Sequence, residues 1–386
     1  MPSEFEKSII SAVKNSVLNQ KDTVLECTDK LCSFARAQQV SYIVYSGCVA
    51  VGLDKSTPAM KRLFIAANGE LLQHERQVNE LALLYKAFDE QSVDYMRLKG
   101  ARLKGLYPCP EMRVMSDADI LIRQEQYPKV RSIMKGLGFE FVTESEHEYI
   151  WKKGNALVLE LHKQLIPSYN EDYYAYFGDG WKRAVAIGKS EYTLSPEDTF
   201  IYVFTHFAKH YRDGGIGIKH VTDIYLYLKN TDMDALYVNA ELKKLKLYTF
   251  YQNVVSLCNA WFDGSEFNEI TEHITKVILS GGAYGTHKAK VHAAALRATL
   301  EGKNVFLKKA FPSLHVMRLR YKYLEKAPIL LPFAWCSRIV TALLCKRDKV
   351  LAQAEDIKSV TDKDIADYQA ALRFVGLDFN IRESGR

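Results

Sequence analysis

Two aspartates separated by one residue constrain the fold and chemistry of this chain more than any other feature. They lie near the end of the run YMRLKGARLKGLYPCPEMRVMSDADILI, which extends from Tyr95 to Ile122. The run predicts a strand, a turn at a glycine, a short helix, a loop and a second strand. Side chains alternate between the two faces of a strand, so Asp117 and Asp119 share one face with Leu121. Two carboxylates are therefore expected to point the same way.

A third carboxylate follows about forty residues later, in the segment ALVLELHKQ. The period of a strand places Leu157, Leu159 and Leu161 on one apolar face and Glu160 on the opposite face. The apolar face fixes the register, because a slip by one residue would bury the carboxylate. We expect this strand to lie in the same sheet as Asp117, with the three carboxylates close enough to share a cation.

Carboxylates that converge in this way repel one another unless a cation neutralises them. Oxygen ligands favour a hard divalent ion, so the expected cofactor is Mg²⁺ or Mn²⁺. This arrangement suits phosphoryl or nucleotidyl transfer. Lys99, Gly100 and Arg113 add two cations and a turn whose backbone can approach phosphate. A lone Asp-x-Asp is short and common and usually just begins a solvated strand, but the whole ordered set favours the functional interpretation.

The order K-G-A, Y-P-x-P-x-x-R, D-A-D-I-L-I and E-L-H resembles a bacterial nucleotidyltransferase group within the polymerase-β-type superfamily. The resemblance covers about Leu98 to His162 and continues more weakly to about Leu228. Better-known members of the superfamily carry Gly-Ser in the phosphate turn, where this chain has Gly-Ala. The resemblance implies that Asp117 and Asp119 are the metal-binding pair and that Glu160 is the third carboxylate. It also implies that Lys99, Gly100 and Ala101 form the phosphate turn.

The expected function is therefore Mg²⁺-dependent transfer of a nucleoside monophosphate from an NTP to a hydroxyl-bearing acceptor, which could be a small molecule, a sugar or a protein. Lys99, Gly100, Ala101 and Arg113 would contact the triphosphate. His206 and the loop that ends at Lys219 would lie across the cleft and help to select the nucleotide or the acceptor. The alternative is a binding module that keeps the fold with weak or no catalysis, and the missing serine in the phosphate turn favours it.

A strong helix signal begins at Ser195, followed by Pro196 at the first helical position. His206 and His210 on this helix have the i, i+4 spacing of a metal pair, and His220 or Asp223 could add ligands. Three interpretations stay open: ordinary polar or hydrogen-bonded side chains, substrate contact, and a metal hydrolase. The last is the weakest, because no H-E-x-x-H glutamate is present.

The predicted fold class is α+β, a small mixed sheet with helices followed by a mainly helical half, because strands and helices do not alternate regularly. Strands are expected over Phe139 to Lys152 and over Ala156 to Leu161, and a helix before them should end at Gly138. The predicted divisions are an N-terminal helical region that packs on the core, a nucleotidyltransferase-like core, a helical substrate-side domain and a helical extension, at residues 1–92, 93–192, 193–310 and 311–386.

Charge and cysteine content limit the kinds of partner and the cellular compartment that are expected for this protein. A net charge of +6 over 386 residues is compatible with anionic substrates but gives no specific signal for nucleic acid. Seven cysteines without a CxxC pair, and an N-terminus without a signal peptide, predict a cytoplasmic protein. The segment Ile329 to Cys345 is very apolar but contains Arg338, so it either contacts a membrane surface or, as we favour, seals the helical domain.

Overall fold

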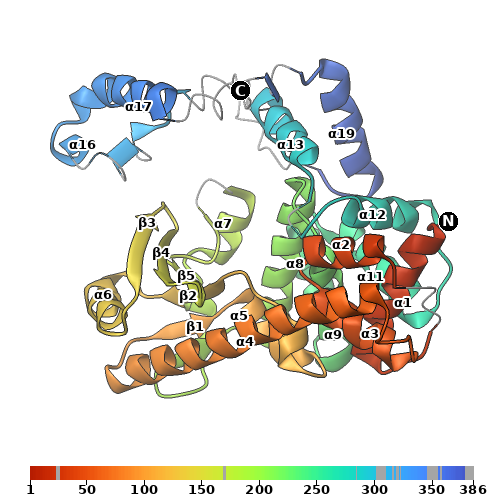
Figure 1. Ribbon diagram of the computed structural model, residues 1–386. Helices are drawn as coiled ribbons and strands as arrows, with labels where there is room; N and C mark the ends of the chain where they lie inside the picture. The colour runs from red at the N-terminus through yellow and green to blue at the C-terminus, as the bar shows by residue number, and fades with distance from the viewer. Residues whose placement is uncertain are drawn as a thin grey trace.

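The computed structural model is an α+β structure, as the sequence predicts, with one mixed sheet beside a large helical half (Figure 1). The described residues are 1–22, 27–167, 171–283, 285–300, 310–314, 317–318, 321, 323–345, 355–356 and 359–378.

The sheet has seven strands in the order β3-β4-β5-β2-β1-β7-β6. Two of the pairings are parallel, β2 with β5 and β1 with β7, and the other four are antiparallel. In chain order the strands are β1 (Tyr95–Arg97), β2 (Ala118–Ile122), β3 (Glu140–Glu144), β4 (Glu148–Lys153), β5 (Leu157–His162), β6 (Val185–Ala186) and β7 (Glu191–Thr193).

Strand β2 is buried along its whole length because both of its faces are covered. Ala118, Ile120 and Ile122 join the hydrophobic core on the sheet side, whereas Leu121 joins the core of the helical half. Alternation therefore directs the two sets of side chains into two different cores, as the sequence predicts. The strand carries its acidic side chain toward the helical half.

The structure corrects the strand expected over Phe139 to Lys152, which is a hairpin of β3 and β4. Helix α6 (Tyr127–Gly136) ends before Gly138, whose φ of +80° gives the left-handed conformation that was expected there. A turn then reverses the chain after β3, closed by the Ser145 amide, which donates to the Glu148 carbonyl at 2.8 Å. Strands β6 and β7 were not predicted, because two or three residues give too little alternation to detect.

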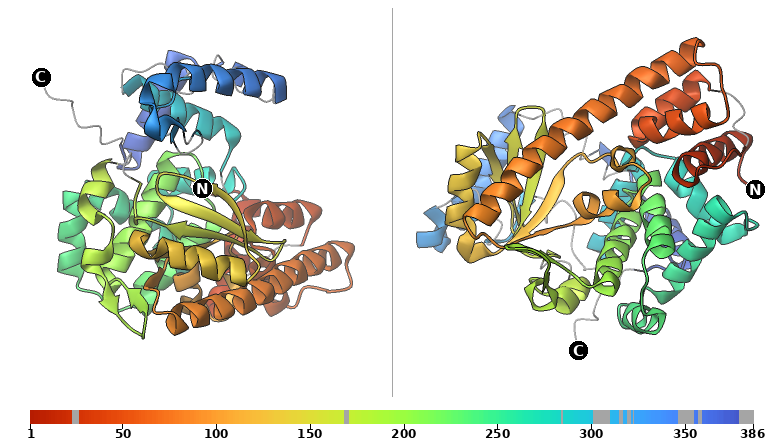
Figure 2. Two further views of the ribbon diagram at one scale, coloured as in Figure 1. Left: turned by 90° about the vertical axis from the view of Figure 1, so that its left-hand side faces the viewer. Right: turned by 90° about the horizontal axis from the view of Figure 1, so that it is seen from below.

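Four helices precede the sheet: α1 (Glu4–Leu18), α2 (Asp29–Gln38), α3 (Ser41–Ala50) and α4 (Pro58–Glu90). Helix α4 has 33 residues and lies along both halves of the molecule (Figures 1 and 2). Its first turns place Met60 and Leu63 in the core of the helical half, and its last turns place Leu84 and Phe88 in the core under the sheet. One continuous helix therefore connects the two cores.

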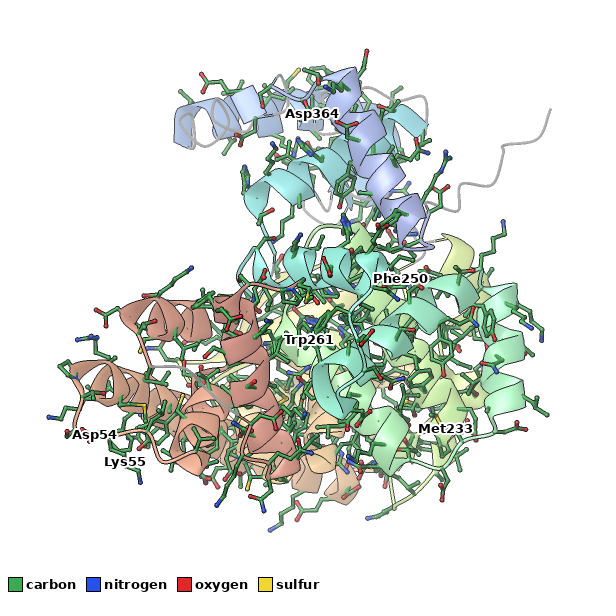
Figure 3. All side chains as sticks on the ribbon, turned by 90° about the vertical axis from the view of Figure 1, so that its right-hand side faces the viewer. Asp54, Lys55, Met233, Phe250, Trp261 and Asp364 are labelled. Carbon is green, nitrogen blue, oxygen red and sulfur yellow. The ribbon has the colours of Figure 1, made fainter. Side chains whose placement is uncertain are left out.

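Aromatic side chains fill the helical half, where Phe250 and Trp261 are almost fully buried (Figure 3). Helix α8 begins as predicted, with the Asp198 amide donating to the Ser195 hydroxyl at 3.0 Å and with Pro196 in its first turn. The remaining helices up to residue 300 are α5 (Lys99–Leu103), α7 (Glu171–Phe177), α8 (Pro196–Arg212), α9 (Ile218–Asn230), α10 (Ala235–Lys244), α11 (Tyr248–Cys258), α12 (Glu269–Leu279) and α13 (His287–Leu300).

The apolar segment Ile329 to Cys345 does not seal the helical domain. Most of it forms α17 (Leu331–Cys345), which packs with the short α16 (Tyr323–Lys326) around a small core of its own and leaves Phe333 70% exposed. Helix α19 (Asp362–Phe374) lies beside α13 (Figure 1). Among the described residues, no helix has both the length and the apolar character needed to cross a membrane.

A close helix contact in the N-terminal region gives a stability prediction. Gly47 on α3 faces α1 so closely that a Cβ would collide with the Ala12 carbonyl oxygen, whereas a Cβ at Gly69 on α4 would meet nothing within 4 Å. We expect Gly47→Ala to lower the free energy of unfolding by about 2 kcal/mol or more, because backbone atoms must move. The matched change Gly69→Ala should raise it by up to about 1 kcal/mol. Urea unfolding measures both; equal effects would contradict this packing.

Candidate active site

Asp119 is the most constrained carboxylate of the predicted site. It is the second residue of β2, and only 7% of its side chain is exposed. One oxygen, Oδ1, accepts a hydrogen bond from the Lys99 ammonium at 2.6 Å and lies 2.7 Å from His162 Nε2. A buried carboxylate needs such partners, because leaving it without them would cost several kcal/mol.

The parallel pairing of β2 with β5 brings Glu160 to Asp119. The two residues are direct partners in the register of these strands. His162 lies two residues beyond Glu160 on the same face, and its Nε2 is 3.8 Å from Glu160 Oε2. The potential ligand atoms of Asp119, Glu160 and His162 all lie within 4.8 Å of one another. The predicted contact between segments about forty residues apart is thus confirmed.

The close approach of these groups changes their pKa values in opposite directions. Burial alone would raise the pKa of Asp119, but the Lys99 ammonium and the hydrogen bond with His162 outweigh it and hold that pKa below its usual range. Burial, followed by the charges of Asp119 and Asp117, raises the pKa of Glu160 to about 8. Without a cation, the site therefore favours a protonated Glu160 near neutral pH.

Asp117 lies one residue before β2 and lines the same cavity as Asp119 and Glu160. Burial and the charge of Asp119 raise the pKa of its carboxyl. The third group that the structure brings within 4.8 Å of Asp119 and Glu160 is His162. The role of Asp117 as a ligand stays a prediction.

The expected phosphate turn begins α5 beside these carboxylates. Lys99 has a φ of +42°, an uncommon conformation for a residue with a side chain, and it points its ammonium at Asp119. A Cβ at Gly100 would meet the Met115 side chain at 3.0 Å, so the space around this glycine is filled by protein. Ala101 is buried in the core under the sheet, and its amide donates to the Leu98 carbonyl at 3.1 Å.

Lys99, Gly100 and the carboxylates of Asp117, Asp119 and Glu160 line a cavity of about 290 Å³ between the sheet and helices α8 and α9. The sheet side carries the carboxylates, and the helix side carries Lys209, Lys219 and His206. Tyr202 on α8 also lines the cavity, and its buried hydroxyl has no hydrogen-bond partner among the described residues. The two walls differ in charge, so the cavity is suited to a ligand that bears both a cation and anionic groups.

Arg113 binds a carboxylate of the opposite wall in this structure. Its Nε and Nη2 donate to both oxygens of Asp223 on α9 at 2.8 to 3.0 Å, and Nη1 donates to the Val114 carbonyl at 2.8 Å. The Tyr107 hydroxyl adds a hydrogen bond to Asp223 at 2.8 Å. This buried pair ties the loop before β2 to α9. Arg113 therefore organises the cavity wall, and a direct phosphate contact stays a prediction.

The histidines of α8 and α9 gather at the same wall but do not form the metal set that was the weakest of the three interpretations. The rings of His206 and His210 have centroids 4.2 Å apart, and that of His220 is 5.5 Å from His210. Burial lowers the pKa of all three, to about 3 for His220, so they are uncharged at neutral pH. Asp223 is occupied by Arg113, and the potential metal clusters of the described residues include none of these groups.

Two glutamines at the end of α2 hold the cavity wall from the N-terminal side. Gln39 Oε1 accepts from the Ser116 hydroxyl at 3.0 Å and from the Lys219 ammonium at 3.1 Å. Gln38 Oε1 accepts from the Ile218 amide at 3.1 Å, at the start of α9. Burial lowers the pKa of Lys219 to about 8. Gln39 is a neutral partner, so it orients this side chain without cancelling its positive charge. Gln39 therefore positions Lys219 close to the aspartate loop.

Some residues in and around the cavity were missed by the sequence reasoning. No role was predicted for Tyr202 or Glu148, which line the cavity, or for Gln39, which holds Lys219. His162 could have been found, since it shares the face of Glu160 in the predicted strand. Nothing in the local sequence around Gln39 signals its contact with Lys219, 180 residues away.

The comparison with protein families bears on this cavity. The model of a family described as "Uncharacterised nucleotidyltransferase" matches residues 27–263, which include the sheet and helices α8 to α11. The chain belongs to this nucleotidyltransferase family. The comparisons of this chain with the curated proteins and with the solved structures found no match. Membership of a nucleotidyltransferase family implies a nucleotide substrate, and the residues that line the cavity with the paired carboxylates all lie inside the matched region, except Ala283.

The residues around Asp119 fit a divalent cation, which such transferases typically use. Two carboxylates and an imidazole nitrogen lie within 4.8 Å of one another, and burial, together with the repulsion between the carboxylates, raises the pKa of Glu160. A cation at this position would relieve that repulsion. Lys99 supplies a single positive charge there in the present structure, through its contact with Asp119.

The raised pKa of Glu160 gives a prediction for the metal-free protein. A carboxyl whose pKa rises on folding contributes stability that is complete below its unfolded value of 4.5 and is lost as the pH rises through about 8. Glu160→Gln stays neutral throughout, so in EDTA above pH 8 its free energy of unfolding should exceed that of wild type by roughly 1–3 kcal/mol. It should therefore melt at a higher temperature. The difference should shrink toward pH 5. Thermal unfolding from pH 5 to 9 measures it, and a pH-independent difference would contradict the assignment.

Proposed function

We propose that this chain is a divalent-cation-dependent nucleotidyltransferase that moves a nucleoside monophosphate from an NTP to a hydroxyl group of an acceptor, with release of pyrophosphate. The observation that carries the proposal is the register pairing of Asp119 with Glu160 inside a cavity whose opposite wall is basic. Family membership supports the reaction class. The cation that we propose is Mg²⁺, or Mn²⁺ in its place.

The sheet side of the cavity would hold the cation through Asp117, Asp119 and Glu160. The cation that these residues would hold supplies positive charge against the negative charge that develops as pyrophosphate leaves. Glu160 either completes the ligand set or accepts the proton of the acceptor hydroxyl. Both roles need the deprotonated form, which a bound cation would favour over the protonated form of the metal-free site.

Lysines on both sides of the cavity would bind the triphosphate. Lys99 and Lys219 both line the cavity near Asp117, where their charges partly offset the burial that raises the pKa of this carboxyl. Lys99 would turn from Asp119 to a phosphate when a cation takes over the carboxylate. His206 is neutral and can donate a hydrogen bond without adding charge. Charge and hydrogen bonds preorganised in this way stabilise a leaving pyrophosphate.

The second candidate is a binding module that holds a nucleotide without turning it over. The absence of a serine hydroxyl in the phosphate turn favours it. The burial of Ala101 weakens this argument, because a side chain at that position faces the core and does not line the cavity. Calorimetric titration with ATP, GTP, CTP and UTP, with and without Mg²⁺, combined with a pyrophosphate-release assay, separates the two candidates: a binding module binds an NTP but releases no pyrophosphate.

The substitution Asp119→Asn tests the cation role directly. It keeps the shape of the side chain but removes one anionic ligand, so Mg²⁺-dependent NTP binding should weaken and pyrophosphate release should fall on the order of a hundredfold or more. The matched control is Asp94→Asn, which removes a carboxylate paired with Arg123 at 2.6 Å outside the cavity.

Circular dichroism and thermal unfolding must show that both variants fold. The control should retain wild-type turnover within about a factor of two. Unchanged turnover in folded Asp119→Asn would remove Asp119 from the reaction, and NTP binding that is indifferent to Mg²⁺ would remove the cation from it.

A further inference from the structure

A second group of potential ligands lines the same cavity and shares His162 with the group around Asp119. It consists of His147 in the turn between β3 and β4, Glu148 at the start of β4, and His162 at the end of β5. One ligand atom of each residue lies within 4.8 Å of the others. His147 Nε2 is 3.0 Å from Glu148 Oε2.

The backbone holds these three residues in place. Glu148 and His162 are direct partners in the antiparallel register of β4 and β5. The Lys163 amide donates to the His147 carbonyl at 2.7 Å, which extends the pairing into the turn. Side chains on paired strands and a hydrogen-bonded turn have little freedom to move apart. The set is therefore built before any ligand binds.

His162 carries an unsatisfied nitrogen in this group. Its side chain is only 4% exposed, and Nδ1 is buried without a hydrogen-bond partner among the described residues. Its Nε2 faces Asp119 Oδ1 at 2.7 Å. Histidines that bind metals commonly use one nitrogen for the ion and hydrogen-bond a carboxylate with the other. A buried nitrogen without a partner is destabilising, and coordination of a metal ion would offset that cost.

We propose that His147, Glu148 and His162 form a transition-metal site of the Zn²⁺ type, adjacent through His162 to the carboxylates that we propose bind Mg²⁺. Two imidazoles and one carboxylate suit Zn²⁺, whereas Mg²⁺ prefers oxygen ligands. Three protein ligands leave a coordination position open, as in sites where a metal ion binds a water or a substrate oxygen. All three residues line the cavity, so an ion that they hold would lie beside the space where the substrates would meet.

Zinc binding without nucleotide tests this site independently of the proposed transferase activity. Metal-free protein is titrated with Zn²⁺ in competition with a chromogenic chelator, and protein purified without chelator is analysed for bound metal. Every protein in the series carries Cys336→Ser, because Cys336 is exposed and free thiols bind Zn²⁺. Wild type should hold about one equivalent of Zn²⁺ that excess Mg²⁺ does not displace.

The diagnostic variants are His147→Ala and Glu148→Gln, whose side chains are more exposed than that of His162, so that the fold is retained. Each should weaken Zn²⁺ binding on the order of a hundredfold. The matched control is His287→Ala. His287 lies 2.7 Å from Asp356 on the surface, a histidine–carboxylate pair that belongs to no potential three-ligand cluster among the described residues. The His287→Ala control should bind Zn²⁺ as tightly as wild type does.

Three results would overturn the proposal: no tight equivalent of Zn²⁺ in wild type, equal Zn²⁺ affinity in wild type and both diagnostic variants, or loss of Zn²⁺ binding in Glu160→Gln with retention in His147→Ala. The last result would assign the zinc to the carboxylates. None of the three depends on pyrophosphate release, so failure of the zinc site and failure of the transferase are distinguishable.

Discussion

The buried carboxylate of Asp119 is the interaction on which the rest of the site depends. Its partners come from two directions: Lys99 from the turn after β1, and His162 from the end of the parallel neighbour β5. Strand β2 supports this carboxylate because it is buried on both faces and cannot shift its register without moving two cores. The same strand pairing sets Glu160 opposite Asp119, and the resulting repulsion is the physical reason that the site favours a cation.

Long-range contacts, rather than the sheet alone, complete the cavity. Helix α4 contributes to both hydrophobic cores, and its buried Gln77 donates to the Met115 carbonyl at 3.0 Å, in the loop that leads to the aspartates. From the other side, Gln39 holds Lys219 and Ser116, and Arg113 holds Asp223. The N-terminal helices therefore do more than cover the core: they fix the distance between the acidic wall and the basic wall of the cavity.

The sequence predicted those parts of the site that follow from local periodicity. Alternation in two strands was enough to bring Asp119 and Glu160 together, and capping residues were enough to start α8 at Pro196. It could not predict that Arg113 pairs with Asp223 or that Tyr202 lines the cavity, since such placements depend on how distant helices pack. The exposure of α17 was also missed, because an apolar segment gives no local sign of what covers it. The proposed roles of Lys99 and Lys219 follow from charge and position alone.

The most direct test of the central claim is a crystal structure with a non-hydrolysable NTP and Mn²⁺, in which anomalous scattering locates the ion. The account predicts an anomalous peak bound by carboxylate oxygens of both Asp119 and Glu160, at roughly the 2.1 Å expected for a Mg²⁺-type site. It also predicts that the triphosphate lies toward Lys99 and Lys219 and that the Lys99 ammonium has left Asp119. A nucleotide bound elsewhere, or a cavity in which Lys99 still occupies Asp119 and no ion lies between the two carboxylates, would contradict it.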